Sequence, residues 1–153
     1  MTRLNLSLLL IAFSFTQMGN SPMAPGHKDG RLTPCPESPN CVSSQNENEA
    51  RYVEPFKVSG DSGNALDRLT KMLSRLKRAK IVEQTEDYLH VEFKVALFGF
   101  IDDVEFLLDA KQGVIHLRSA SRSGYWDFGL NRRRIKSLRQ KWRALSSASN
   151  FSN

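Results

Sequence analysis

Residues 88–98 read YLHVEFKVALF, and apolar and polar side chains alternate along most of this stretch. Residues 104–108 and 115–117 continue the alternation. Because successive side chains of a β-strand point to opposite faces, a period of two with one polar side predicts an antiparallel sheet with one covered face and one open face. The centre of the fold is therefore expected to be a sheet.

Two turns predict how these strands pair. A four-residue turn at residues 110–113 places Asp109 opposite Val114 and Glu105 opposite Arg118. A turn at residues 98–101 predicts four pairs in the preceding hairpin: Val95 with Val104, Phe93 with Phe106, Lys94 with Glu105, and His90 with Asp109. In this register apolar side chains meet apolar ones, and charged side chains form a ladder on the open face.

Two further segments have the periodicity of amphipathic helices. Asn64 is a candidate N-cap for the first helix, whose apolar residues share one face: Leu66, Leu69, Met72, Leu73 and Leu76. The second helix has the stripe Ile135, Leu138, Trp142 and Leu145. The sequence thus predicts an α+β fold, an antiparallel sheet of about four to five strands with two helices packed on one face.

The composition limits the chain to one small globular unit. Of its 153 residues 40% are hydrophobic and 25% charged, which is enough for one modest core and hardly for two. We expect a single α+β domain over residues 32–145, and a disordered polar tail over residues 146–153. Residues 52–58 are expected to form an edge strand, because Pro55 cannot donate to a ladder.

The N-terminal segment has the pattern of an export signal. A positive start at residues 1–3 precedes an apolar run at residues 4–15, and polar, small and proline residues follow. This order predicts a secretory signal peptide over residues 1–21, or an uncleaved membrane anchor, and then a linker over residues 22–31. We therefore expect an exported protein.

Cys35 and Cys41 enclose a five-residue loop with two prolines, which bends the chain tightly. A disulfide is sterically reasonable there, and in an oxidising compartment it would stabilise the domain by about 2 kcal/mol. Two alternatives stay open. The thiols could be free, or they could bind a metal, although two further ligands at usable spacing are missing.

Three segments carry a family resemblance: residues 35–44 (CPESPNCVSS), residues 98–106 (FGFIDDVEF) and residues 118–134 (RSASRSGYWDFGLNRRR). In this order they resemble the family known as domain of unknown function 1499, over roughly residues 32–143. The resemblance implies a small exported domain in the periplasm or, in a photosynthetic lineage, in the plastid or thylakoid lumen. It implies no activity, so no catalytic residue carries over.

The third segment has the composition of an anion-binding site. Arg118 and Arg122 offer forked donors, Ser119 and Ser121 offer hydroxyls, and Asn131 marks a helix start with unsatisfied backbone N–H groups. The remaining residues of the predicted site are Asp102, Asp103, Asp127 and Arg132. A small anionic ligand fits this chemistry. The leading prediction is a non-catalytic binding or accessory protein, and the alternative is that the aspartates neutralise these arginines within the protein.

A hydrolase would use parts of the same segments. Asp102 and Asp103 would act with Arg118, Ser121 and Arg122 as acid, base and electrostatic stabiliser. No metal site is expected, because adjacent aspartates on a strand point to opposite faces and oxygen-ligand sites need more partners. No cofactor is expected either.

The net charge of +6 is distributed in blocks: residues 61–80 carry +4, residues 81–117 carry −6 and residues 118–153 carry +8. Nucleic-acid binding is not expected, because the protein is predicted to be exported and its aromatic residues are not interleaved with basic ones. The basic helix faces could attract anionic lipid headgroups, which predicts a membrane-surface assembly factor as a further function. A protein partner is also compatible with an accessory role, and the protein itself is expected to be a monomer.

Overall fold

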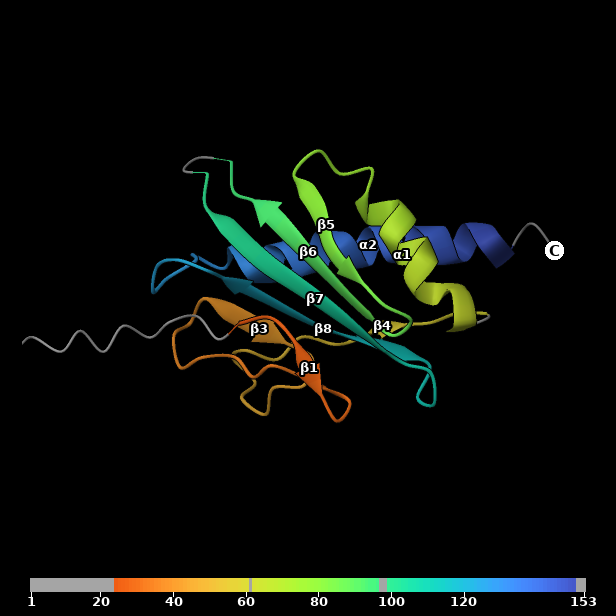
Figure 1. Ribbon diagram of the computed structural model, residues 1–153, viewed down its shortest axis with the longest axis horizontal. Coiled ribbons are helices and arrows are strands. Elements are labelled where there is room, and N and C mark those ends of the chain that lie inside the picture. Colours follow the sequence, from red (N-terminus) through yellow and green to blue (C-terminus); the bar gives the residue numbers. More distant parts are fainter. Residues whose placement is uncertain (1–23, 61, 97–98, 151–153) are drawn as a thin grey trace, which may run out of the picture.

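Six strands form one sheet in the computed structural model, which describes residues 24–60, 62–96 and 99–150 (Figure 1). The sheet has the order β3-β8-β7-β6-β5, and β4 also pairs with β8. All of these pairings are antiparallel. The strands are β3 (Cys41–Ser43), β4 (Phe56–Lys57), β5 (Ala79–Gln84), β6 (Tyr88–Lys94), β7 (Ile101–Asp109) and β8 (Val114–Ser121).

The predicted α+β class is confirmed, but the sheet has more strands than the four or five expected. The additional strand is β3, whose three residues are too few to show an alternating pattern. β4 lies within the edge strand expected at residues 52–58, but it has only two residues. The predicted signal peptide, residues 1–21, lies outside the described residues.

Two helices cover one face of the sheet (Figure 1). A short 3-10 helix, η1 (Ser62–Asn64), leads into α1 (Ala65–Leu73), and α2 (Leu130–Asn150) is the last element described. Asn64 takes the N-cap position of α1, but its side chain makes no capping hydrogen bond. The apolar faces of both helices join the main core, where the Trp142 ring stacks on that of Phe56 and the Phe56 ring is tilted against that of Phe106. α2 runs through Asn150, so it includes part of the segment expected to be a tail.

The pairing of β7 with β8 agrees with the prediction, with Glu105 opposite Arg118. The predicted pairing of β6 with β7 was wrong by four residues, since Val104 lies opposite Val91 and His90 lies opposite Glu105. The cause is the connection between these strands, which spans residues 95–100 instead of turning at residues 98–101. Residues 97–98 lie outside the described part. Because a shift of four is even, every side chain stays on its predicted face.

The charged face of the sheet is covered, whereas the sequence predicted an open face. A hairpin of β1 (His27–Lys28) and β2 (Arg31–Leu32), in the segment expected to be a linker, lies over it. Leu32 packs with Tyr88 and Leu107 in a small second core, and the His27 ring lies 4.6 Å from the Tyr88 ring. Helices therefore cover one side of the sheet, and the N-terminal hairpin covers the part of the other side around Tyr88 and Leu107.

Candidate functional site

The sheet divides the nine residues of the predicted site into two groups. Neighbours on a strand point to opposite faces, so Asp102 and Asp103 cannot meet. On the face under the hairpin lie Asp103, Arg118 and Arg122, and on the face under α2 lie Asp102, Ser119, Ser121, Asp127 and Asn131. Arg132 belongs to neither group, because it donates to the carbonyl oxygens of Ala50 and Tyr52.

A buried ion pair lies at the centre of the first group. Arg118 Nη1 donates to Glu105 Oε2 at 2.6 Å, and these side chains are 1% and 0% exposed. Glu105 Oε1 also accepts hydrogen bonds from Tyr88 Oη at 2.9 Å and from the backbone N–H of Gly26 at 2.6 Å. Burial, and then the negative charge of Glu105, raises the pKa of Tyr88. The Glu105–Arg118 pair was predicted from the sequence. Tyr88 and Gly26 were not predicted as partners, because the register and the covering hairpin bring them to Glu105.

A second charge cluster lies on the same face around Asp103. His90 Nε2 lies 2.6 Å from Asp103 Oδ1, and Arg122 donates to both Asp103 oxygens at 2.7 and 2.8 Å. Arg122 also donates to Glu92 at 2.7 Å. Burial alone would raise the pKa of Asp103, but the hydrogen bonds from His90 and Arg122 outweigh it and hold that pKa at about 2. His90, expected on a wet surface, is buried here.

The second group is organised by Asn131 at the start of α2. Asn131 Oδ1 accepts from Ser119 Oγ at 2.6 Å, and Nδ2 donates to Ser121 Oγ at 3.0 Å and to the carbonyl oxygen of Asn40 at 2.9 Å. The backbone N–H of Asn131 was predicted to be available to an anion. It already donates to the carboxylate of Asp127, with 2.8 Å between N and Oδ2. The side chain of Asn131 thus connects α2 by hydrogen bonds to β8 and to Asn40, the residue before β3.

Arg134 and Asp102 form the ion pair of this second group. Arg134 Nη2 donates to Asp102 Oδ2 at 2.5 Å, and Nη1 donates to Asn131 Oδ1 at 2.6 Å. Arg134 was not among the predicted site residues, although its position one helical turn after Asn131 places both side chains on the same face of α2.

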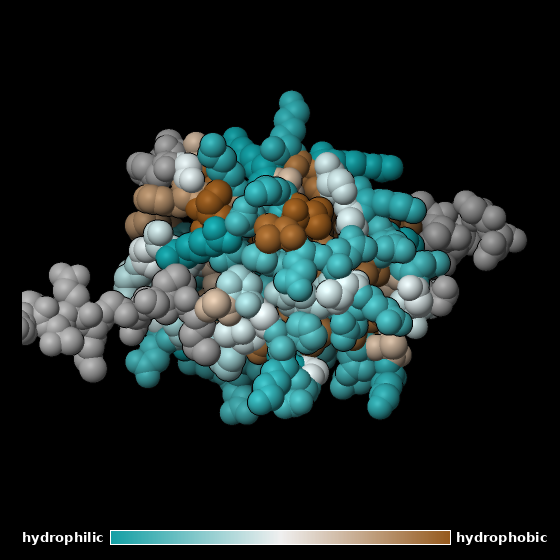
Figure 2. Space-filling model, in the orientation of Figure 1, coloured by the Kyte–Doolittle hydropathy of each residue, from teal (hydrophilic) through white to brown (hydrophobic). Residues whose placement is uncertain are grey.

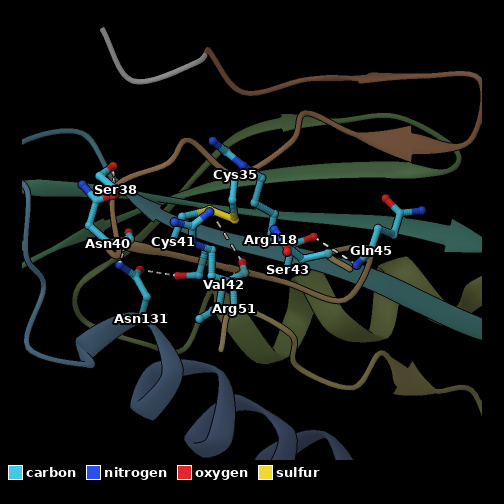
Figure 3. The surroundings of a disulfide bond; sticks show 12 residues. Cys35, Ser38, Asn40, Cys41, Val42, Ser43, Gln45, Arg51, Arg118 and Asn131 are labelled. Carbon is cyan, nitrogen blue, oxygen red and sulfur yellow. Dashed lines mark hydrogen bonds between the residues drawn. A yellow bond between two sulfur atoms is a disulfide. The ribbon is translucent and has the colours of Figure 1, made fainter. Parts of the chain in front are cut away.

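The predicted disulfide between Cys35 and Cys41 is present, and it fixes the loop that carries Asn40. Figure 3 shows the side chain of Asn131 reaching the backbone carbonyl oxygen of Asn40 beside this disulfide. Asn40 Nδ2 also donates to the carbonyl oxygen of Gly124 at 2.5 Å. The disulfide loop, residues 35–41, and the β8–α2 loop, residues 122–129, therefore contact each other directly.

A family model described as "Protein of unknown function (DUF1499)" matches residues 31–142. The chain belongs to this family. The DUF1499 match includes the whole sheet, the disulfide loop and both groups of site residues. No curated protein and no solved structure matches the chain.

The arginines predicted to bind an anion in this DUF1499 domain have partners within the protein. Arg118 and Arg122 are paired with carboxylates, and Arg132 donates to carbonyl oxygens. An incoming anion would have to displace these groups, so the geometry gives no support to an anion site at this loop, which stays a prediction. The residues named for a hydrolase lie on both faces of the sheet and do not converge.

Neither a metal centre nor a bilayer-spanning helix was found in the described part of this DUF1499 domain. Across residues 24–60, 62–96 and 99–150, no three His, Cys, Asp or Glu side chains are grouped so that they could share a metal ion. Within those same ranges, no helix has both the length and the apolar character needed to cross a bilayer.

A different surface, between α1 and α2, combines apolar and basic side chains. A groove of about 720 Å³ has the apolar residues Met72, Leu76, Ala144 and Leu145 along it, and the basic residues Arg68, Lys71, Arg75 and Lys141 around it. We refer to it as the helix groove. Basic helix faces were predicted from the sequence, but not that cations and apolar residues of both helices would line one groove.

Proposed function

We propose that this DUF1499 domain is a non-catalytic accessory protein that docks on the anionic surface of a membrane through the helix groove. The observation that carries the proposal is that four basic and four apolar side chains line one groove. Lysine and arginine attract anionic headgroups, and apolar side chains beside them contact the acyl boundary.

In the sheet, carboxylates neutralise the buried arginines. The positive charge of α2 has few such partners in the part of the chain that the structure describes. α2 contains seven basic residues and no acidic one. Among the described residues, Arg134 is the cation of α2 that forms an ion pair, whereas Arg133 and Arg139 donate to backbone carbonyl oxygens. A carbonyl oxygen satisfies the guanidinium group without neutralising it. Each basic residue near an anionic surface contributes about 1 kcal/mol of attraction.

Vesicle co-sedimentation tests this proposal. Wild-type protein is mixed at low salt with phosphatidylcholine vesicles, or with vesicles that also contain phosphatidylglycerol. We expect sedimentation with the anionic vesicles only. The double variant Arg75→Glu, Lys141→Glu should bind them about tenfold more weakly or worse, because it reverses two charges of the groove.

The matched control is Lys28→Glu, Lys111→Glu, which makes the same charge change at exposed positions away from the groove. Its binding should fall far less. Failure of the wild-type protein to sediment with anionic vesicles, or an equal loss in both double variants, would reject membrane docking through the groove. Thermal unfolding of each variant shows that the fold is retained.

A further inference from the structure

Three aromatic side chains project into solvent from the β8–α2 loop. Tyr125, Trp126 and Phe128 are 63%, 64% and 83% exposed. On the face drawn in Figure 2, hydrophobic residues form only small patches among hydrophilic ones. Because exposed aromatic rings forgo the free energy of burial, a group of them on one loop indicates a contact surface.

The backbone of this loop is held in place. Asp127 accepts hydrogen bonds from the N–H groups of Gly129 and Asn131, both at 2.8 Å. Phe128 has a φ of 53°, a left-handed conformation that residues other than glycine seldom adopt. The aromatic rings thus extend from a preorganised backbone, which lowers the entropy cost of binding a ligand.

Tyr125 and Trp126 each form one wall of a small hollow. The Tyr125 hollow, of about 230 Å³, also has Ser38, Asn40 and Arg122 in its lining. The Trp126 hollow, of about 290 Å³, is lined in addition by Asn48, Arg51 and Arg132. The disulfide loop contributes residues to both, so the two hollows share a rigid wall.

The chemistry of the two hollows is that of a sugar site. An aromatic face packs against the C–H bonds of a pyranose ring, while amides, hydroxyls and guanidinium groups bond to its hydroxyls. Arg122 is already neutralised by Asp103 and Glu92, so it acts as a fixed donor and not as a phosphate clamp. Arg132 is held in position by two carbonyl oxygens. We infer that the two hollows bind a saccharide chain, with sugar rings stacked on Tyr125 and Trp126.

Binding to polysaccharides tests this inference. The full chain is incubated with insoluble chitin, cellulose and peptidoglycan sacculi, and titrated calorimetrically with soluble chito- and cello-oligosaccharides. We expect saturable binding to at least one of them. Tyr125→Ala and Trp126→Ala should each weaken it about tenfold or more, since stacked aromatic residues dominate such contacts.

Phe128→Ala is the matched control, because Phe128 is exposed on the same loop and lines neither hollow. Its affinity should stay close to that of the wild type. A spectroscopic readout is independent of affinity. Of the two tryptophans, Trp142 is buried, so a saccharide should shift the emission of Trp126 to shorter wavelength and protect it from acrylamide quenching.

Absence of saturable binding to all of these saccharides overturns the inference, and so does wild-type affinity in both Tyr125→Ala and Trp126→Ala. The membrane proposal is tested separately. The groove variant Arg75→Glu, Lys141→Glu alters no residue of either hollow and should bind saccharide as the wild type does.

Discussion

At the scale of single residues, Glu105 connects the charged face of the sheet to the segment that covers it. Its two oxygens accept hydrogen bonds from Arg118, Tyr88 and Gly26, which belong to two other strands and to the covering segment. A buried carboxylate is tolerated only when its charge is paired and its lone pairs are occupied. All three partners satisfy this requirement together.

Glu105→Gln should lower the free energy of unfolding by about 3 kcal/mol, because it leaves the buried guanidinium of Arg118 without its counter-charge. Urea denaturation measures the loss. Glu92→Gln is the control, since Glu92 pairs with Arg122 and Lys80 at the rim of the sheet and should cost less than about 1 kcal/mol. Equal losses in the two variants would contradict the special position of Glu105.

Asp103 predicts how stability changes in acid. Its pKa is about 2 in the folded protein and 3.8 as its ordinary value, so the folded state holds the carboxylate in its charged form. The resulting stabilisation is complete above a pH of about 4 and is lost as the pH falls toward about 2. Unfolding free energies measured across this range should fall less steeply in Asp103→Asn than in the wild type. Parallel curves would show that another group controls acid unfolding.

At the scale of elements, α2 is attached to the sheet by Asn131 at one end and by Trp142 nearer the other. Asn131 bonds to β8 and to the disulfide loop, and Trp142 Nε1 donates to the carbonyl oxygen of Lys57 at 2.8 Å. The helix therefore holds two loops that are distant in sequence in fixed positions. Both hollows of the proposed saccharide site depend on this arrangement.

Asn131→Ala should destabilise the protein by about 3 kcal/mol, because several buried polar groups lose their partner at once. Differential scanning calorimetry would show this as a lower melting temperature. The control, Ser137→Ala, changes an exposed polar residue in the middle of α2 and should leave the melting temperature nearly unchanged. A small effect of Asn131→Ala would mean that water replaces the amide.

Removing the disulfide with Cys35→Ser, Cys41→Ser should cost about 2 kcal/mol, as expected for a short closed loop. Because the disulfide loop forms a wall of both hollows, saccharide affinity should also fall. Vesicle binding should persist, since the helix groove contains no residue of this loop. Loss of vesicle binding in a folded variant would show that the two surfaces are coupled.

At the scale of the whole molecule, the alternating pattern of residues 88–117 predicted the sheet and the face of each side chain. It could not predict the register of the β6–β7 hairpin, because slipping by four residues preserves every face. It also could not predict that the hairpin of β1 and β2 covers part of the charged face. That hairpin is short and polar, and its packing depends on one small cluster with Tyr88.

The candidate site was only partly predictable for a related reason. The Glu105–Arg118 pair follows from a tight turn at residues 110–113, which leaves little freedom in register. The strand pattern places Asp102 and Asp103 on opposite faces, although both were predicted for one site because they are neighbours along the chain. Asn131 was predicted to start a helix. That its side chain connects this helix to the disulfide loop could not be predicted, because Asn40 is distant from it in the sequence.

The charge of the whole chain separates into a neutralised sheet and a basic helical layer. Salt should therefore distinguish the two proposed surfaces. Raising the ionic strength should release the protein from anionic vesicles, because exposed charges are screened beyond about 8 Å at physiological salt. Saccharide affinity, which depends on stacking and short hydrogen bonds, should hardly change, and calorimetry at two salt concentrations would measure it. Equal salt dependence of both would contradict this division.

The bond between the Gly26 N–H and Glu105 limits how far the N-terminus of the protein can be trimmed by proteolysis. A peptidase that cut after Lys28 would remove this donor and the His27 ring that lies against Tyr88. Glu105 and Arg118 would then become accessible to water on the face that the hairpin covers. A cleavage that preserves these two contacts must therefore fall before Gly26, and limited digestion followed by mass measurement would locate that boundary.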